Sequence, residues 1–397
     1  MLILKNARLI PELTEGYEEK SADVVIEDGK ITEIVPAGLA RFGESDEVID
    51  LDGKTLMPGL IEAHLHLDLC GMDTFEENVQ PDGYRVMRAL KLAQDNLKMG
   101  YTTVRDLGDR NNITLGLSQA VKDGLVTGPD ILTSGMIISP TEMGNDYFGS
   151  MYVEADSPEE YIKCVRKQYQ MGADWIKIMA SGAIMNPGAT PGIPIIFERE
   201  LEAACEAADY VKRPVAVHCH GTDAIKMCIR CGVRTVEHST LMDDEVIEMY
   251  LKSGKTFPIP TFSPVIDFIE HANKRPKHYV EKTLKITDQY FEGMNKLRKS
   301  GVKIGWGTDA GVYEGSHGNG LYESIARVKY AGFTPLECLI QATKNNAEIL
   351  MIDDTVGTIK VGKKANLVVF SGNPDEYIEA LANVDIVIKD GNVINLA

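Results

Sequence analysis

Both ends of the chain alternate apolar and polar residues with a period of two, which is typical of β-strands with one buried face. The pattern occurs in seven short stretches, at residues 2–10, 22–26, 30–35, 48–53, 366–370, 384–388 and 392–394. Glu27-Asp28-Gly29, between the second and third stretches, is a hairpin signal. Because these β-rich ends flank a different middle, we predict a small β-sandwich domain formed by residues 1–57 and 353–397.

The middle of the chain alternates short apolar runs with helical periodicity. The apolar runs are Leu60–Leu67, Thr102–Leu107, Ile131–Ile138, Trp175–Ala180, Pro214–His220, Thr235–Ser239, Thr256–Ile259 and Val302–Thr308. Helical periodicity is clearest in Gly83–Met99, Pro158–Met171, Glu198–Val211, Asp243–Leu251 and Val280–Lys299. Such alternation predicts an α/β fold, a (β/α)8 TIM barrel over residues 58–352. A doubly wound open sheet would need a glycine-rich turn after its first strand, where this chain has His-Leu-His-Leu-Asp.

Composition narrows the function classes only a little. The 397 residues are 44% hydrophobic and 25% charged, which suits one large domain and a small one. A net charge of −18 argues against nucleic acid and anionic membranes as partners, and it also serves general solubility. No apolar run approaches a membrane span, and residues 1–10 lack a signal-peptide core. The seven cysteines lack disulfide-framework spacing, so we expect a cytoplasmic protein.

Residues that could bind metal gather where the predicted strands end. They are His64, His66, Lys177, His218, His220, His238 and Asp309, and they include five of the eight histidines in the chain. In a barrel of this kind the active site lies at the C-terminal ends of the strands. Residues two apart on a strand point to the same side, so His64 and His66 would project together. Imidazole nitrogens with a carboxylate suit zinc and similar divalent ions, whereas isolated histidines would more often be core or surface residues.

Lys177 is unusual because it carries a charge inside the apolar run 175–180. Burial of a lysine is costly unless the amine is paired or altered. One reading gives it a buried carboxylate partner. The other makes it a lysine that has reacted with CO2, giving an anionic carbamate that can bridge two cations.

Several motifs along nearly the whole chain resemble the amidohydrolase superfamily. They are residues 57–66, MPGLIEAHLH; 100–106, GYTTVRD; 172–182, GADWIKIMASG; 232–238, GVRTVEH; 307–311, GTDAG; and 357–368, GTIKVGKKANLV. They are similar to the imidazolonepropionase-related branch, which includes metal-dependent Xaa-Pro dipeptidases and Xaa-Arg or Xaa-Lys carboxypeptidases. Asn366 stands where that branch usually has aspartate.

The resemblance implies a site with two divalent metal ions, for which zinc is the expected element. His64, His66 and Asp309 would hold one ion, His218 and His238 the other. Lys177, carboxylated by CO2, would bridge them. Asp309 and His238 are the expected catalytic residues, with Asp309 passing a proton from water to the leaving nitrogen of an amide.

The substrate is less determined, because two family features are changed. Residues 139–145 replace a Thr-Gly-Gly-His turn that helps hold the substrate carboxylate, and His220 stands where relatives often have tyrosine. His220 is expected to contact the substrate in the tyrosine's place, or else to support a metal ligand. His317 and Tyr147, on loops after strands eight and three, are further candidate substrate contacts. Arg105 is another, with a structural ion pair as its alternative.

We therefore expect hydrolysis of a small-molecule amide or dipeptide, by a prolidase-like or carboxypeptidase-like enzyme. The alternative is a hydrolase of non-peptide amides, such as an N-acyl amino acid, a cyclic amide or a xenobiotic amide. A non-catalytic metal-binding scaffold would tolerate loss of ligands, yet all six ligand positions are filled. Homo-oligomers are expected, without nucleic-acid or membrane partners.

Overall fold

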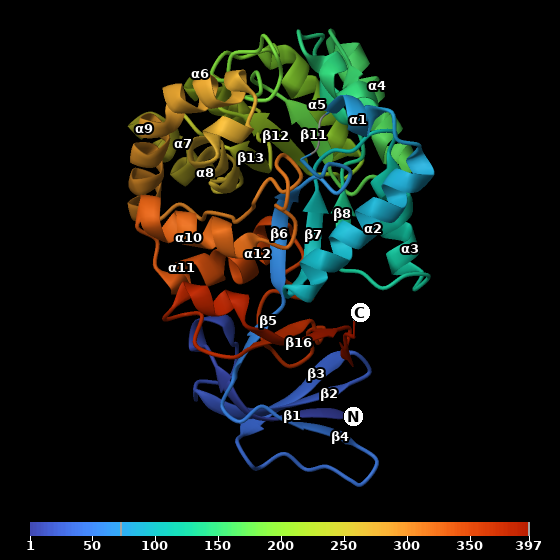
Figure 1. Ribbon diagram of the computed structural model, residues 1–397, viewed down its shortest axis with the longest axis vertical. Coiled ribbons are helices and arrows are strands. Elements are labelled where there is room, and N and C mark those ends of the chain that lie inside the picture. Colours follow the sequence, from blue (N-terminus) through green and yellow to red (C-terminus); the bar gives the residue numbers. More distant parts are fainter. Residues whose placement is uncertain (72–73, 396–397) are drawn as a thin grey trace.

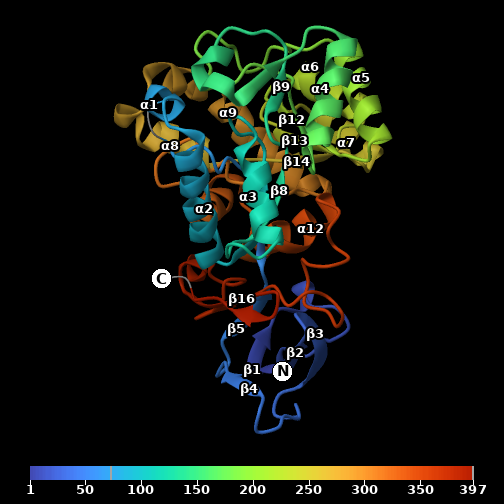
Figure 2. The ribbon, with the colours of Figure 1, turned by 90° about the vertical axis from the view of Figure 1, so that its right-hand side faces the viewer.

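The computed structural model describes residues 1–71 and 74–395. Figures 1 and 2 show strands surrounded by helices in the larger part of the molecule, with a separate sheet below them. Segments near both ends of the described chain lie in that lower sheet (Figure 1).

The lower sheet is built from both ends of the chain, as the sequence predicts. Its order is β17-β16-β15-β5-β1-β2-β3, and β4 pairs with β1. The antiparallel pair of β5 and β15, with Val368 opposite Met57, joins the N-terminal strands to the C-terminal ones. The eight strands are β1 (Leu2–Leu9), β2 (Ser21–Glu27), β3 (Lys30–Pro36), β4 (Glu47–Asp50), β5 (Thr55–Pro58), β15 (Leu367–Phe370), β16 (Val384–Lys389) and β17 (Asn392–Val393). The division of the chain into two domains stays a prediction.

Strand β15 packs on both of its faces. Leu367 and Val369 belong to the core of the lower sheet, together with residues such as Leu4. Val368 and Phe370 point the other way and join the core of the larger part. Because side chains alternate along a strand, four consecutive apolar residues thus attach the lower sheet to the strands above it.

The larger part contains two parallel sheets. One has the order β6-β7-β8, and the other has the order β10-β9-β11-β12-β13-β14. Every strand pair in them is parallel, so the C-terminal ends of the strands meet at one edge. The strands are β6 (Leu60–Leu65), β7 (Tyr101–Asp106), β8 (Asp130–Thr133), β9 (Ile137–Ser139), β10 (Tyr152–Glu154), β11 (Ile176–Met179), β12 (Val215–Cys219), β13 (Thr235–His238) and β14 (Phe257–Ile259).

Helices lie around these strands (Figure 1), and each of the five predicted helical segments coincides with or overlaps one. Helix α4 shows why: Ser157 caps its first turn by accepting a hydrogen bond from the Glu160 N–H, and Gly172 ends it in the left-handed conformation. None of the helices in the described residues is long and apolar enough to cross a membrane. The α-helices are α1 (Thr74–Asn78), α2 (Asp82–Lys98), α3 (Ile113–Lys122), α4 (Pro158–Met171), α5 (Glu198–Tyr210), α6 (Thr222–Arg230), α7 (Asp244–Ser253), α8 (Ser263–Glu270), α9 (Lys277–Ser300), α10 (Gly320–Ala331), α11 (Pro335–Ile340) and α12 (Asn346–Ile349). Shorter helical turns are η1 (Pro11–Leu13), η2 (Asn145–Met151), η3 (Ala272–Lys274), η4 (Gln341–Asn345) and η5 (Ile378–Ala382).

Two predicted strands differ from the structure. The predicted strand 131–138 is split into β8 and β9, which belong to different sheets, because Gly135 turns the chain with a φ of +62°. The predicted strand 302–308 is not a regular strand. It still pairs on both sides: the Gly305 N–H donates to Pro258 O at 3.0 Å, and the Asp309 N–H donates to His64 O at 2.7 Å. Glycines weaken strand geometry and let this segment approach its neighbours closely.

The carboxylate of Glu15 ties the N-terminal segment to a C-terminal loop, accepting hydrogen bonds from Thr358 and Lys360 at 2.7 Å each. These bonds lower the pKa of Glu15 from 4.5 to about 2. Its contribution to stability is therefore complete above pH 4.5 and is lost as the pH falls towards about 2.

We expect Glu15→Gln to lower the free energy of unfolding at pH 7, with the difference from wild type vanishing near pH 2. Urea unfolding at several pH values measures this, with exposed Glu12→Gln as control, and a pH-independent difference would contradict it.

Candidate active site

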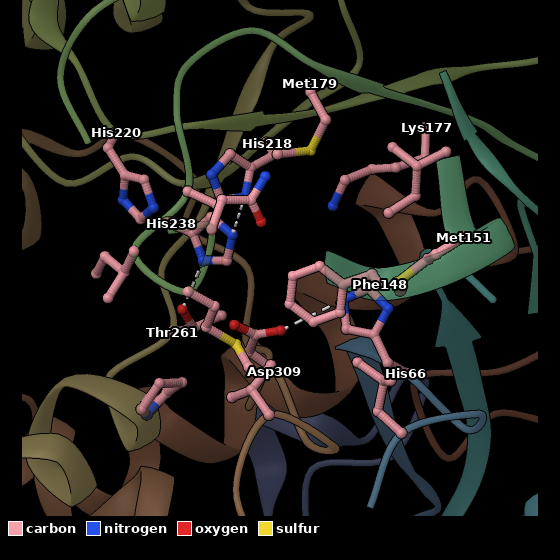
Figure 3. A pocket seen from close by; sticks show the side chains of 18 of the residues that line it. His66, Phe148, Met151, Lys177, Met179, His218, His220, His238, Thr261 and Asp309 are labelled. Carbon is pink, nitrogen blue, oxygen red and sulfur yellow. Dashed lines mark hydrogen bonds and ion pairs between the residues drawn. The ribbon is translucent and has the colours of Figure 1, made fainter. Parts of the chain in front are cut away.

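The six predicted ligand residues meet beside one cavity of about 730 Å³. His64 lies in β6 and His66 just after it, Lys177 in β11, His218 in β12, His238 at the end of β13, and Asp309 after the segment 302–308. Figure 3 shows His66, Lys177, His218, His238 and Asp309 projecting into one space from these different strands. Parallel strands explain the convergence, because they bring residues far apart in sequence to one edge.

His64 and His66 face the same carboxylate, as their spacing predicts. The Nε2 atom of each lies 3.4 Å from Asp309 Oδ1. On its other side, His64 Nδ1 lies 2.8 Å from Glu237 Oε2, and His66 Nδ1 lies 2.9 Å from the carbonyl oxygen of Gly108. Because a carboxylate and a carbonyl can only accept, both Nδ1 atoms carry the proton. Both Nε2 atoms therefore face Asp309 and are the ring atoms available for a metal.

His218, His220 and His238 form a second group of imidazoles. His238 Nε2 lies 2.9 Å from His218 Nδ1, and its Nδ1 bonds Thr261 Oγ1 at 2.8 Å. His220 bonds Thr240 Oγ1 at 2.7 Å, and its ring stacks on that of His238 with centroids 4.9 Å apart. Burial holds the pKa values of His218 and His238 well below the usual range. These rings are therefore neutral, as metal ligands must be.

Charge in the cavity is carried by Asp309 and Lys177. Burial alone would raise the pKa of the Asp309 carboxyl, but His64 and His66 hold it well below its usual range. Lys177 is 2% exposed, and burial lowers the pKa of its amine to about 8. Among the described residues, no hydrogen bond or ion pair holds the Lys177 amine, so the buried partner that one sequence interpretation gave it does not contact it directly.

Backbone strain also gathers at this site. His238 has a φ of +65° and Asp309 a φ of +56°, the left-handed region that favours glycine. Each such residue costs on the order of 1 kcal/mol. The fold thus holds two candidate ligands in positions that their backbones do not prefer.

These residues fit a divalent metal centre. The buried Nε2 atoms of His64 and His218 have no hydrogen-bond partner in the protein. Two groups of ligand atoms, His64/His238/Asp309 and His218/His220/His238, each lie within 4.8 Å of one another. Nitrogen and carboxylate donors of this kind suit zinc.

Comparison with known proteins agrees with this geometry. The sequence pattern of the amidohydrolase family matches residues 55–394. The chain belongs to the amidohydrolase family. It is therefore an enzyme of the class that hydrolyses C–N bonds, and the resemblance drawn from its motifs is confirmed.

Three relatives align with nearly the whole of this chain. Ochratoxinase of Aspergillus niger is 28% identical over 400 residues, which cover 92% of this chain and 80% of that protein. The crystal structure of a Xaa-Pro dipeptidase with bound methionine in the active site is 30% identical, with a TM-score of 0.89 and 99% of both chains covered. Imidazolonepropionase of Rhizobium rhizogenes is 22% identical over 402 residues, which cover 92% of this chain and 90% of that protein.

Of the four predicted substrate contacts, one lines the cavity and three lie outside its lining. His220 lines it. Tyr147 lines an adjoining outer hollow, where its hydroxyl lies 3.4 Å from that of Tyr279. His317 is turned away and bonds Leu69 O at 2.9 Å. Arg105 is fully buried behind the cavity, so its contacts favour the structural role over substrate binding.

Arg105 forms its ion pair with Glu237 and not with the neighbouring Asp106. Its guanidinium donates to Glu237 at 3.0 Å, to the Thr235 hydroxyl at 3.0 Å and to Ala63 O at 2.6 Å. Asp106 instead accepts hydrogen bonds from the N–H groups of Leu67, just after β6, and of Gly108. Strand alternation is the reason, because adjacent residues of a strand face opposite ways.

Sequence reasoning missed the residues that orient the ligands. Glu237 holds His64, Thr261 holds His238, and Thr240 holds His220. A signal existed for Glu237, which is an acidic residue inside the apolar run 235–239. Burial raises the pKa of Glu237, but Arg105 and His64 lower it to about 2. Thr240 and Thr261 carried no comparable signal, since threonine is common at strand ends.

We expect Glu237→Gln to lower the free energy of unfolding by about 3–5 kcal/mol, because it leaves the buried Arg105 guanidinium without its counter-charge. Urea unfolding at pH 7 measures the change. Glu248→Gln is the matched control: Glu248 pairs with Lys252 at 3.3 Å on the surface, and its loss should cost less than about 1 kcal/mol. Equal effects of the two substitutions would contradict the structural role of the buried pair.

Proposed function

We propose that this amidohydrolase cleaves the amide bond of a small molecule with two divalent metal ions, zinc being the expected element. The observation that carries the proposal is the convergence of His64, His66, Lys177, His218, His238 and Asp309 on one cavity. The assignment of ligands follows the resemblance. His64, His66 and Asp309 would hold one ion, His218 and His238 the other, and Lys177, carboxylated by CO2, would bridge them.

The chemistry of the site follows from its charges. When bound, the metal ions would lower the pKa of a water molecule and polarise the scissile carbonyl. Asp309 is ionised, so it can accept the proton of the attacking water and pass it to the leaving nitrogen. Thr261 bonds the Nδ1 atom of His238 and so fixes the orientation of this ring in the cavity. Apolar residues around the cavity keep other water away.

Two substrate classes remain candidates. The prolidase-like and carboxypeptidase-like expectation makes the substrate a dipeptide, and the similarity to a Xaa-Pro dipeptidase supports it. The second class is non-peptide amides, and the apolar lining of the cavity favours it. Phe148, Met151, Met179, Val265 and Phe268 are all part of that lining. Similarity to ochratoxinase is compatible with cleavage of an amide bond in a dipeptide or in a non-peptide amide.

We also propose the finer form of the fold: a closed (β/α)8 barrel with a β-sandwich from both termini. Hydrogen bonds at both joints between the parallel sheets support closure. The Asp174 N–H donates to Thr133 O at 2.8 Å, and the Ala63 N–H donates to Trp306 O at 3.3 Å. A cytoplasmic location is proposed from the seven free cysteines, and homo-oligomers stay a prediction.

Metal analysis tests the centre. Protein prepared with zinc and bicarbonate is expected to hold about two zinc ions per chain, and Lys177→Ala about one or fewer, because the bridging group is lost. Carbon-13 bicarbonate should give a carbamate signal that is absent from Lys177→Ala. Lys252→Ala, 76% exposed on α7, is the control. Unchanged zinc content in Lys177→Ala would refute the bridge.

Activity tests the role of Asp309. A screen of dipeptides, N-acyl amino acids and other amides should find a substrate that is cleaved with release of its amine. Asp309→Asn should then lower kcat by about 10²–10⁴-fold, because the amide cannot take up the proton. Glu248→Gln should keep full activity. Chelation of the metal should abolish hydrolysis, and added zinc should restore it.

A further inference from the structure

Asn186 is a buried amide with no partner in the protein. It lies on the loop after β11, it is 0% exposed, and it lines the cavity. Neither its Nδ2 nor its Oδ1 has a hydrogen-bond partner. Among the described residues it is the one buried side chain that leaves two polar atoms unpaired. Buried amides are almost always hydrogen-bonded, so this one is suited to a bound molecule.

The backbone around Asn186 is, by contrast, firmly held. Lys282 of α9 donates to Asn186 O at 2.7 Å and to Ala183 O at 3.3 Å. His278, also in α9, bonds Met185 O at 3.2 Å. The loop is therefore fixed by its carbonyls, while the amide of Asn186 is left free at the cavity wall. A side chain on a backbone fixed in this way is already positioned before the substrate binds, which lowers the entropy cost of recognition.

The Tyr152 phenol lies against the Asn186 amide, and their contact falls short of full hydrogen-bond geometry. Burial and the Glu142 carboxylate raise the pKa of this phenol, so the charge acting on this part of the cavity is negative. Apart from the histidines, Lys177 is the only basic side chain in the described lining. Lys282 lies behind the loop, with its amine bound to carbonyls. Away from the two proposed metal ions, a carboxylate on the substrate would thus meet no cation at this wall of the cavity, and its desolvation would be costly.

We propose that Asn186 hydrogen-bonds an uncharged carbonyl or N–H group of the substrate, and that the substrate is an uncharged amide with an apolar group. This inference rests on the proposed function and selects between its two substrate classes. The apolar group lies against Phe148, Met151 and Phe268. A planar amide offers one donor and one acceptor side, which match the Oδ1 and Nδ2 of Asn186. Free dipeptides, with their terminal carboxylate, are the disfavoured class.

Two matched compounds test the proposal on zinc-loaded enzyme. N-benzoyl-L-phenylalaninamide and N-benzoyl-L-phenylalanine share the benzoyl–nitrogen bond and differ only in the terminal charge. Release of benzoate should be at least about tenfold more efficient for the amide, as kcat/KM. An equal or greater efficiency for the acid would overturn the proposal.

Variants test Asn186 itself. Asn186→Leu, which is similar in shape but apolar, should lower kcat/KM for the amide about tenfold and change that for the acid little. Asn186→Ala, which also removes both polar atoms and adds no charge, should do the same if the leucine variant does not fold. Asn273→Leu, at an exposed position on η3, is the control and should change neither. An equal loss for both compounds, or no loss, would overturn the assignment.

A measurement of binding affinity tests the role of Asn186 independently of whether the enzyme hydrolyses the compound. If neither compound is hydrolysed, neither is consumed, and titration calorimetry can measure both. A tenfold tighter Kd for the amide, lost in Asn186→Leu, would support the recognition role even though hydrolysis had failed. Equal affinities, or a preference for the acid, would overturn it.

Discussion

The buried carboxylate of Glu237 is the contact on which the active site depends. It accepts hydrogen bonds from His64 in β6, from Arg105 in β7 and from Thr235 in its own strand, β13. Arg105 also reaches Ala63 O and lies over the Trp175 ring at 4.3 Å. One ion pair therefore links strands from opposite sides of the interior. The carboxylate of this pair orients the ligand His64 while it balances a guanidinium that could not otherwise be buried.

Much of this arrangement could be predicted from the sequence, because it depends on local patterns of apolar and polar residues and of histidines. Alternation at both ends indicated the lower sheet, and histidines at strand ends indicated the cavity. Other features depend on side chains that meet only in three dimensions. Arg105 could not be assigned to Glu237, since 132 residues separate them. The split at Gly135 and the irregular segment 302–308 depend on how tightly neighbouring chains approach, which apolar periodicity does not record.

Several features of the active site lower the stability of the folded protein. His64 Nε2, His218 Nε2 and the Asn186 amide are buried without partners, and His238 and Asp309 have left-handed backbones. Each feature is unfavourable in an empty fold. A bound metal ion or substrate would satisfy the unpaired atoms and would offset the cost of the two backbones. Binding should therefore stabilise this region more than its size would suggest.

The pairing of β5 with β15 has a consequence for synthesis on the ribosome. Residues 55–58 are made long before their partners at residues 367–370. The parallel strands β6 to β14 are made in between, so their lower apolar surface stays uncovered until Val368 and Phe370 follow. A chain that stopped before residue 367 would therefore leave that surface open to aggregation.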